Sequence, residues 1–482
     1  MLCLPIELFA RICETLAVSD IMSVTGTCRD LRKVRQGGYI PALTLYANAV
    51  KHPRRHAMLG RATHIRARKC GTRRLIGIMA EYAGYIASLH LRKVLIPNIA
   101  IVAPCVNLQI LNISGMDIYS VAGLNTCRSL QVFKASRTSI EDISALSGLP
   151  ALHTVIMTSS ALAALPRLDA VRKLHIANTR VGDISSLAYA TGLQNLDIVQ
   201  TDVSDIAVLA ALPIRKLKHS AAVHTAQQFS RPTLAKLAVC GQTLLPLPLY
   251  SIRDLRVCAN LWKVVVKNAL ITDIGVLAEC PHIRTLNIGY TRVTTVPVLP
   301  RLCKLIAHGC PLTDIENVGY AVGLVYLDVS QTGLQSLAGL EKCTVLETLV
   351  ATNNQIREID TLRALTRLKY CDIGHNYCRD LSPLQTCCNI RHLDITGNMV
   401  NTLEVVVHLA GLETLKVGGT RIYDINALQN CENLQYADIS WTSVYELEPL
   451  RHCKKMHTLL VRGCPIADHT ISDHIYNTML PH

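Results

Sequence analysis

The chain has 482 residues, of which 50% are hydrophobic and only 4% are aromatic, and its formal net charge is +14. No run of 18 uncharged apolar residues occurs, so we expect no membrane-spanning helix. The charge is uneven, because residues 1–100 hold 16 Lys and Arg against 5 Asp and Glu. A basic amino-terminal part and a near-neutral remainder therefore need separate explanations.

The first forty residues have the spacing of short amphipathic helices. Leu8, Ile12 and Leu16 are four residues apart and fall on one helix face. Ser19 or Asp20 can cap a second helix. We therefore predict a small α-helical module at the amino terminus.

Residues 1–40 also resemble the F-box, whose pattern begins with L-P-x-E-L and ends with C-R-x-L. The matching residues are, in order, Leu4, Pro5, Glu7, Leu8, Ile12, Leu16, Asp20, Ile21, Val24, Cys28, Arg29 and Leu31. F-boxes dock on the Skp-type adaptor of cullin-RING ubiquitin ligases. The resemblance implies that the residues facing this adaptor are Leu4, Pro5, Leu8, Ile12 and Leu16. The alternative is a plain helical cap over the open apolar end of the first repeat.

Residues 41–85 are predicted to be a basic linker or amino-terminal cap. Within residues 51–74, nine Lys and Arg occur and no Asp or Glu. Such a segment can bind nucleic acid, an acidic membrane surface or an acidic protein, but it is more often a solvated basic face. No aromatic residues are interleaved for base stacking, so nucleic acid is not an expected partner.

Residues 86–482 are predicted to be a repeat array with a carboxyl-terminal cap. The repeated pattern is L-x-x-L-x-I-x-x-T/N-x-I-x-x-I/L-x-x-L-x-x-C-x-x, mostly 22 residues long. Its eighteen copies begin at Ile86, Leu108, Leu130, Leu152, Val171, Leu193, Ile214, Leu234, Leu261, Ile283, Leu302, Leu324, Leu346, Leu368, Ile390, Leu412, Leu434 and Met456. A weaker copy begins near Ala62. Steps of 19 residues precede Val171 and Leu302, and the spacing is least regular from Ile214 to Leu261.

Each repeat is predicted to form one short strand whose apolar side chains point inward. This strand should pair in parallel with the strands of the neighbouring repeats, about 4.8 Å away. The T/N position turns the chain, and its side chain can bond backbone groups that would otherwise be buried without a partner. The return segment is long enough only for a helical turn or a 3-10 stretch. The residues at the T/N position are Thr179, Thr201, Thr291, Thr332, Asn354, Asn376, Asn398, Thr420 and Thr442.

The array resembles the leucine-rich-repeat superfamily. Its D-I-x-x-L return, as at Asp183-Ile184 and Asp424-Ile425, is similar to the class shared by the internalins and a regulatory subunit of protein phosphatase. The resemblance implies an α/β solenoid, with a curved parallel sheet on the concave face and short turns on the convex face. It implies a binding surface without naming its ligand.

The repeat also accounts for many of the 19 cysteines. Seven cysteines lie three positions before a repeat start, namely Cys105, Cys127, Cys280, Cys343, Cys387, Cys431 and Cys453. Two more, Cys310 and Cys464, lie at the T/N position. We expect them to be small buried residues, not disulfides or zinc ligands, since no C-x-x-C pair occurs.

Glu7 and Arg11 interrupt any signal-like apolar start, so we expect a cytoplasmic or nuclear protein with reduced thiols.

The third, fifth and seventh positions of each strand pattern are predicted to face the concave surface, and they segregate by charge. The middle repeats carry Lys173, His175, Lys216, Lys218, Lys236, Lys263 and Lys304, joined by Lys267 at a seventh position. The carboxyl-terminal repeats carry Tyr326 with Asp328, Tyr370 with Asp372, His392 with Asp394, Tyr436 with Asp438, and Trp441 at an edge.

The carboxyl-terminal group favours a site for a basic partner segment. Asp372 and Asp394 are expected to lie opposite each other, and such like charges destabilise a sheet by several tenths of a kcal/mol. A surface that keeps the pair beside exposed tyrosines indicates recognition. The alternative is that L-D-I is a tolerated variant of a solvated strand. Lys216 and Lys236 would suit an anionic group.

We expect no enzymatic activity and no cofactor, because no P-loop, G-x-G-x-x-G, H-E-x-x-H or G-x-S-x-G motif occurs. The tail residues Asp468, His469, Asp473 and His474 match no defined metal site. The resemblance of residues 1–40 to the F-box, ahead of the repeats, implies that the chain is the substrate-recognition subunit of an SCF-type cullin-RING E3 ubiquitin ligase. Its partners would be a Skp-type adaptor with its cullin and an unidentified target protein. The alternative is a scaffold or phosphatase-regulatory protein whose amino terminus is only a cap.

Overall fold

The computed structural model describes residues 44–46, 64–68, 75–76, 79, 83–96, 98–220, 232–240 and 249–466. The chain divides into two compact units, Met1–Ala221 and Ala222–His482. This division falls within the region of irregular repeat spacing. The predicted helical module over residues 1–40 lies outside the described residues.

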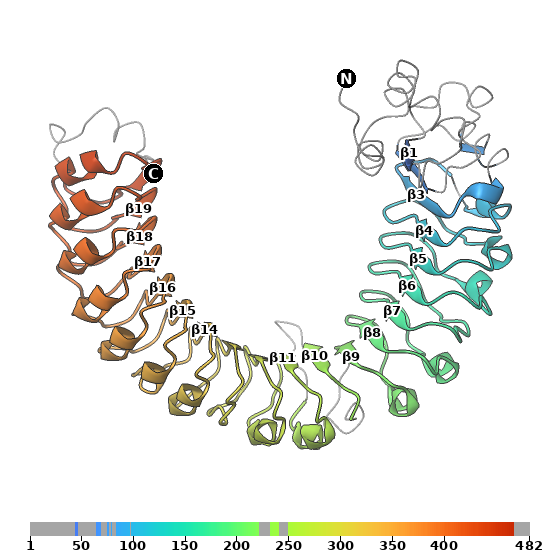
Figure 1. Cartoon of the computed structure of the whole chain (residues 1–482), viewed down its shortest axis with the longest axis horizontal. Coiled ribbons are helices and arrows are strands. Elements are labelled where there is room, and N and C mark those ends of the chain that lie inside the picture. The colour runs from blue at the N-terminus through green and yellow to red at the C-terminus, as the bar shows by residue number, and fades with distance from the viewer. Residues whose placement is uncertain are drawn as a thin grey trace, which may run out of the picture. The chain divides into compact units, whose positions relative to one another are not determined.

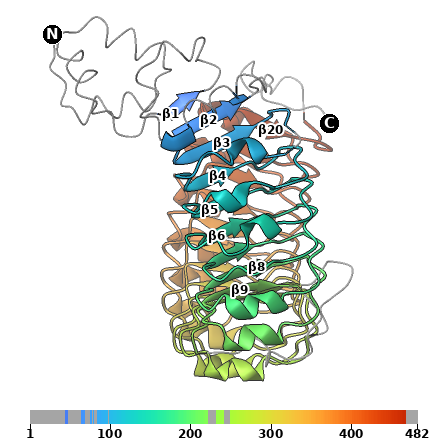
Figure 2. The ribbon, with the colours of Figure 1, turned by 90° about the vertical axis from the view of Figure 1, so that its right-hand side faces the viewer.

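The first unit is a stack of short parallel strands that pair in the order of the sequence (Figure 2). They are β1 (Thr44–Tyr46), β2 (His64–Arg68), β3 (Ser88–Arg92), β4 (Ile110–Asn112), β5 (Val132–Lys134), β6 (Thr154–Ile156), β7 (Lys173–His175), β8 (Asn195–Ile198) and β9 (Lys216–His219). Short 3-10 helices return the chain: η3 (Ala83–Tyr85), η4 (Ala100–Val102), η5 (Leu124–Thr126), η6 (Ser144–Leu146), η7 (Ser185–Tyr189) and η8 (Ala207–Ala211).

The second unit repeats this plan. Its parallel strands are β10 (Lys236–Cys240), β11 (Lys263–Lys267), β12 (Thr285–Asn287), β13 (Lys304–Ile306), β14 (Tyr326–Asp328), β15 (Thr348–Val350), β16 (Tyr370–Asp372), β17 (His392–Asp394), β18 (Thr414–Lys416), β19 (Tyr436–Asp438) and β20 (Thr458–Leu460). Its 3-10 helices are η10 (Arg253–Val257), η11 (Gly275–Glu279), η12 (Glu316–Tyr320), η13 (Leu340–Lys342), η14 (Asp360–Ala364), η15 (Ser382–Thr386), η16 (Glu404–His408), η17 (Asn426–Asn430) and η18 (Glu448–His452). In each unit the strands line one side and the 3-10 helices the other (Figure 1).

The predicted repeats are confirmed. Each of the eighteen repeat starts is followed, two residues later, by a strand, from β3 to β20. β2 begins two residues after Ala62, where the weaker copy is predicted. The segment 41–85, predicted as a linker or cap, thus contributes β1 and β2 to the sheet, with Ile65 opposite Leu89.

The apolar positions stack into narrow buried layers. In the repeat that begins at Leu412, the side chains of Leu412, Leu415, Val417 and Ile422 have no exposed surface. Phe133 is the largest fully buried side chain among the described residues, and the rest of the core is mainly aliphatic. Each layer is covered by the layers of the neighbouring repeats, as expected for a solenoid.

An aspartate begins many of the return segments. Asp183 Oδ1 accepts a hydrogen bond from the backbone N–H of Ser185 at 2.7 Å, directly before η7. Asp424 accepts the equivalent bond from Asn426 before η17, also at 2.7 Å. A short acidic side chain is well suited to such a turn, which explains the D-I-x-x-L pattern.

The two 19-residue repeats lack a return helix. No 3-10 helix lies between β6 and β7 or between β12 and β13, two stretches whose residues are all described. The three missing residues therefore remove the helical turn and leave the strand and its inward side chains in place.

The T/N side chains bond backbone groups, as predicted. Thr179 Oγ1 donates to Ile176 O at 2.7 Å. Asn376 does more, because its Nδ2 donates to Ala351 O and its Oδ1 accepts from the Ile356 N–H, at 2.9 and 3.0 Å. The longer amide side chain thus links its own turn to the preceding repeat.

The fourteen cysteines whose side chains are described are all free thiols, and most are buried. The thiols of Cys387 and Cys453 donate to a backbone carbonyl of the preceding repeat, at 3.2 and 3.5 Å. Burial raises the pKa of the Cys387 thiol to about 11, so it remains protonated at neutral pH. Cys258 is also buried three residues before a repeat start and extends this group.

Candidate functional site

The candidate site is the strand face, defined as the third, fifth and seventh positions of the repeats. On most strands the third and fifth side chains are partly exposed and the residue between them is buried. This alternation follows from the two-residue period of a strand. It places every residue predicted for the concave surface on the strand face except Trp441, which follows a strand.

In the first unit, β7 and β9 present the predicted basic residues. Lys173 and His175 flank the buried Leu174, and Lys216 and Lys218 are exposed. Burial is the main cause that lowers the pKa of His175, with the neighbouring lysines acting in the same direction. This histidine is therefore mainly neutral at pH 7.

Asp197 is a residue of this face that sequence reasoning missed. It lies at the fifth position of β8 and is only 7% exposed. Lys218 Nζ is 2.8 Å from Asp197 Oδ2, so this lysine is already paired. The pattern L-Q-N-L-D-I places Asp197 at the fifth position and could have identified it.

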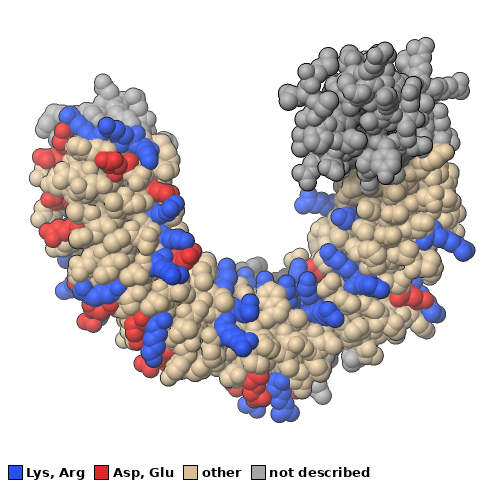
Figure 3. Space-filling model, viewed as in Figure 1, with Lys and Arg blue, Asp and Glu red and all other residues tan. Residues whose placement is uncertain are grey.

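In the second unit, basic side chains gather over the strand face near β10 and β11 (Figure 3). Lys236 lies directly opposite Lys263 in the sheet. Lys236 Nζ is 4.2 Å from the centroid of the Trp262 ring, which sequence reasoning did not assign. Like charges at opposed positions destabilise a sheet, and the aromatic ring offsets part of that cost.

The face changes character at β13 and β14. Lys304 Nζ lies 3.8 Å from the centroid of the Tyr326 ring, and the two residues are opposite each other. Asp328, beyond Tyr326, is 3.2 Å from Nδ1 of His308, another residue that the sequence analysis missed. A basic and an aromatic–acidic region therefore meet here through direct contacts.

The predicted acidic pair is present on β16 and β17. Asp372 lies opposite Asp394, and the rings of Tyr370 and His392 are 5.7 Å apart. Burial is the main cause that raises the pKa of Asp372, and the charge of Asp394 acts in the same direction.

Lys416 modifies the expectation of a purely repulsive acidic pair. This lysine lies opposite Asp394 on β18, with Nζ 3.3 Å from Asp394 Oδ2. It neutralises one member of the pair and leaves Asp372 without an ion pair among the described residues. Lys416 stands at a fifth position, so the repeat pattern could have revealed it.

Trp441 lies beyond β19 in a left-handed turn, with φ 60° and 62% of its surface exposed. A Cβ atom on Gly463 would collide with the Trp441 ring, so the ring packs against the glycine of the next repeat. The Arg462 guanidinium is 5.4 Å from the ring centroid. Glycine at that position leaves the space that the exposed aromatic ring occupies.

The same arrangement recurs at two earlier turns. Tyr290 and His375 also have positive φ, 55° and 54°, and their rings lie against Gly309 and Gly397. Non-glycine residues adopt this conformation at a cost, and bulky ones do so rarely. In all three turns the glycine of the following repeat therefore leaves space for an aromatic or imidazole ring at the edge of the strand face.

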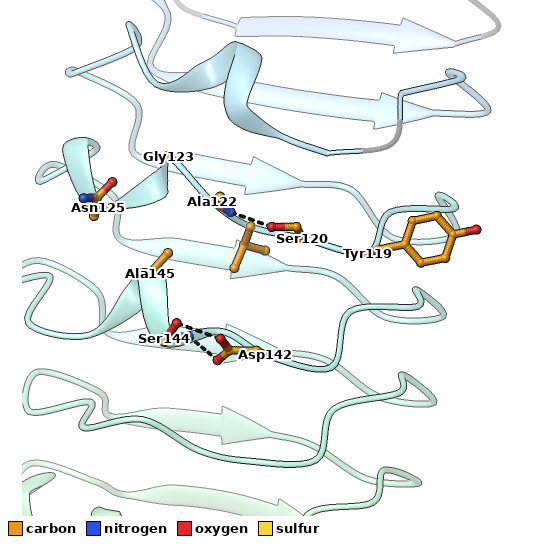
Figure 4. Close-up of a pocket in the computed structure, with 9 residues that line it drawn as sticks. Tyr119, Ser120, Ala122, Gly123, Asn125, Asp142, Ser144 and Ala145 are labelled. Carbon is orange, nitrogen blue, oxygen red and sulfur yellow. Dashed lines mark hydrogen bonds between the residues drawn. The ribbon is translucent and has the colours of Figure 1, made fainter.

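A separate shallow depression lies among the return segments near Tyr119 and Asp142 (Figure 4). The Asp142 carboxylate accepts bonds from the backbone N–H and the hydroxyl of Ser144, at 2.7 and 2.8 Å. Its acidic group therefore serves its own turn. The depression offers no unused charged group that would suggest chemistry.

Several predicted sites lie outside the described residues. These are the adaptor-facing residues Leu4, Pro5, Leu8, Ile12 and Leu16, most of the basic segment 51–74 and the tail from 467. Within the described part of the chain, no group of three or more His, Cys, Asp or Glu side chains could hold a metal ion. No helix of that part is long and apolar enough to cross a membrane.

No family model matches the chain, and no curated protein matches its sequence. The resemblance of residues 1–40 to the F-box therefore gains no support from these comparisons.

Solved structures do resemble the fold. A leucine-rich-repeat protein of Leptospira interrogans is 15% identical, with a TM-score of 0.62, over 78% of this chain and 96% of its own. The leucine-rich-repeat ectodomain of the Arabidopsis thaliana receptor kinase GASSHO1/SCHENGEN3 is 15% identical, with a TM-score of 0.60, over 80% of this chain and 48% of its own. The plant peptide hormone receptor RGFR1 is 13% identical, with a TM-score of 0.54, over 78% of this chain and 67% of its own. These likenesses show that the fold of this chain is that of leucine-rich-repeat proteins.

Proposed function

We propose that the chain is a non-catalytic scaffold that binds a protein partner on its strand face. The observation that carries this proposal is that the fold does not require the charges of that face. Asp372 Oδ1 accepts a bond from the N–H two residues later, at 3.1 Å. Asn112 and Asn287 stand at the same position and accept the same bond at the same distance. Asparagine thus performs the structural task, which leaves the negative charge of Asp372 available to a partner.

The aromatic residues support the same proposal. Tyr370 is 37% exposed and Trp441 is 62% exposed, although each belongs to an ordered repeat. Tyrosine and tryptophan are enriched among the residues that contribute most to protein interfaces. Held by a strand or a stacked turn, such rings lose little conformational freedom when a partner binds.

Two structural neighbours were solved with a partner. GASSHO1/SCHENGEN3 was solved in complex with CASPARIAN STRIP INTEGRITY FACTOR 2, and RGFR1 in complex with RGF2. At their low identity these structures suggest a mode of use for the fold and no particular ligand for this chain.

A quantitative pull-down tests the strand face. We expect the double substitution Tyr370→Ala and Asp372→Ala to abolish partner capture and to change thermal stability little. The matched control is Tyr423→Ala with Glu432→Ala, which removes an exposed tyrosine and an exposed carboxylate outside the strand face. Capture that survives the first double change, or is lost equally with the control, would contradict the proposal.

We further propose that residues 1–40 recruit a Skp-type adaptor and its cullin, which would make the chain the substrate-recognition subunit of an E3 ubiquitin ligase. The support is the ordered match of those residues to the F-box pattern. The chain would then act by raising the effective concentration of its target near the ubiquitin-loading machinery.

Affinity purification separates this finer proposal from the alternatives. Replacement of Leu4, Pro5 and Ile12 should remove the adaptor and cullin and leave target capture intact. Purification without any adaptor, but with a phosphatase catalytic subunit, would instead favour a phosphatase-regulatory scaffold.

A further inference from the structure

The strand face of the second unit has a basic part formed by β10 to β13. Lys236, Lys263, Lys267 and Lys304 stand at its third and seventh positions. No Asp or Glu occupies a third, fifth or seventh position of these four strands, all of which are described. A partner lying here meets only positive or neutral side chains.

The part formed by β14 to β19 has the opposite sign. Its fifth positions carry Asp328, Asp372, Asp394 and Asp438 against the single basic residue Lys416. His308 and Lys416 pair with two of these carboxylates. The carboxylates of Asp372 and Asp438 make no ion pair with any described residue.

The flanking second-position row does not alter this polarity over β15 to β18. Lys369 pairs with Glu347 at 2.9 Å, and Arg391 pairs with Glu413 at 3.3 Å. These neighbouring charges cancel in pairs. The change from positive to negative charge along the strand face is therefore not cancelled by the second-position residues beside it.

The polarity excludes a uniformly charged partner over the whole face. A polyanion such as a nucleic acid would be attracted to the lysines and repelled by Asp372 and Asp438. A uniformly basic segment would be attracted to Asp372 and Asp438 and repelled by Lys236 and Lys263. Only a partner with both signs, separated along its length, is complementary to both parts.

The separation of the two parts sets the length of that partner. From β13, the last strand of the basic part, to β16, which carries the unpaired Asp372, there are three strand steps of about 4.8 Å, or about 14 Å in total. An extended polypeptide advances about 3.3 Å per residue, so about four residues span this distance. Tyr326, on β14, lies between these two strands and can contact the middle of such a segment.

We infer that the second unit binds an extended polypeptide segment with an acidic block over β10–β13 and a basic block over β16–β19, the blocks about four residues apart. This inference rests on the proposed protein-binding function and specifies the partner's chemistry. The matching of charge signs would fix the position of the segment and would steer its approach.

The experiment measures fluorescence anisotropy of labelled synthetic peptides with the full chain. One peptide has four Glu, four Gly and Ser, and four Lys in blocks, and a second has the same composition with the charges alternating. We expect the block peptide to bind at least tenfold more tightly, and added salt to reduce this preference. Equal binding of the two peptides, or binding of neither, would overturn the inference.

Reversing the charge of two lysines should weaken the binding of one peptide and create the binding of another. Lys263→Glu with Lys267→Glu should weaken the block peptide tenfold or more and create binding of an all-Lys peptide. The gain of binding excludes a simple folding failure. Lys342→Glu, on η13 away from the strand face, should leave both affinities unchanged. Reversal variants that do not exchange peptide preference would overturn the inference.

Failure of this inference is distinguishable from failure of the proposed function. If the Tyr370 and Asp372 substitutions abolish native partner capture but the reversal variants do not alter it, the scaffold function stands and the bipolar partner is wrong. If capture depends on neither set of residues, the strand face is not the binding surface and both fail.

Discussion

Replacing Asn376 by alanine should strongly destabilise the second unit. Its side chain is only 3% exposed, and its three shortest hydrogen bonds go to backbone groups: the Ile356 N–H at 3.0 Å, Ala351 O at 2.9 Å and Ile373 O at 2.9 Å. A buried polar group that loses its partner costs about 1–3 kcal/mol. With partial relaxation of the three groups, we expect Asn376→Ala to lower the free energy of unfolding by about 3–5 kcal/mol.

Two further variants calibrate this value. Thr442, at the equivalent position, donates to the carbonyl three residues earlier at 2.7 Å. Asn376→Thr should therefore keep one of the three bonds and lose about 2 kcal/mol. Asn389 donates to a carbonyl of the preceding repeat at 2.8 Å but is exposed, so Asn389→Ala should cost less than about 0.5 kcal/mol.

The assay is urea unfolding followed by circular dichroism, with hydrogen exchange of the Ile356 amide as a local measure. A repeat array need not unfold in a single step, so the local measure identifies where protection is lost. The reasoning is refuted if Asn376→Ala costs less than about 1 kcal/mol and the Ile356 amide remains protected.

Asp372→Asn should stabilise the chain by about 0.5 kcal/mol at pH 7, since the turn bond survives and a like charge is removed. Because the folded pKa of Asp372 is raised, this gain should vanish as the pH falls below the carboxyl range, and a gain independent of pH in thermal melts would contradict it. Gly463→Ala should displace the Trp441 ring and shift its fluorescence, whereas Gly419→Ala, at a similar φ but with no ring above it, should cost only backbone strain; equal spectra would contradict the stacking. Maleimide should modify Cys388 in the native chain before the buried described thiols, and peptide mass mapping of a different first site would contradict this order.

The strands could be predicted because each repeat buries the same positions. A period of 22 residues fixes where Leu412 and Leu415 point, and the strand centred on Leu415 follows. β1 could not be predicted in this way, because the repeat pattern cannot be followed to Thr44–Tyr46. The two short repeats could be predicted from their 19-residue spacing. The absence of a 3-10 helix in them could be seen only in the structure.

The residues that lie on the strand face could be predicted, but the ion pairs and ring contacts that they make could not. The positions of Asp372 and Asp394 follow from the repeat register alone. The contacts of Lys416 with Asp394 and of His308 with Asp328 depend on side-chain reach and rotamer, which a periodic pattern does not specify. The pose of Trp441 depends on the glycine of the following repeat, a relation visible only in three dimensions.

The two repeats without a return helix have a consequence for cooperativity. In a solenoid the stability is approximately a sum of repeat terms and nearest-neighbour interface terms. A repeat with fewer residues outside its strand offers less interface to the repeats on either side. Unfolding that starts at an end of either unit can therefore pause at β6–β7 or at β12–β13. These repeats are the points where each unit can separate into blocks that melt independently.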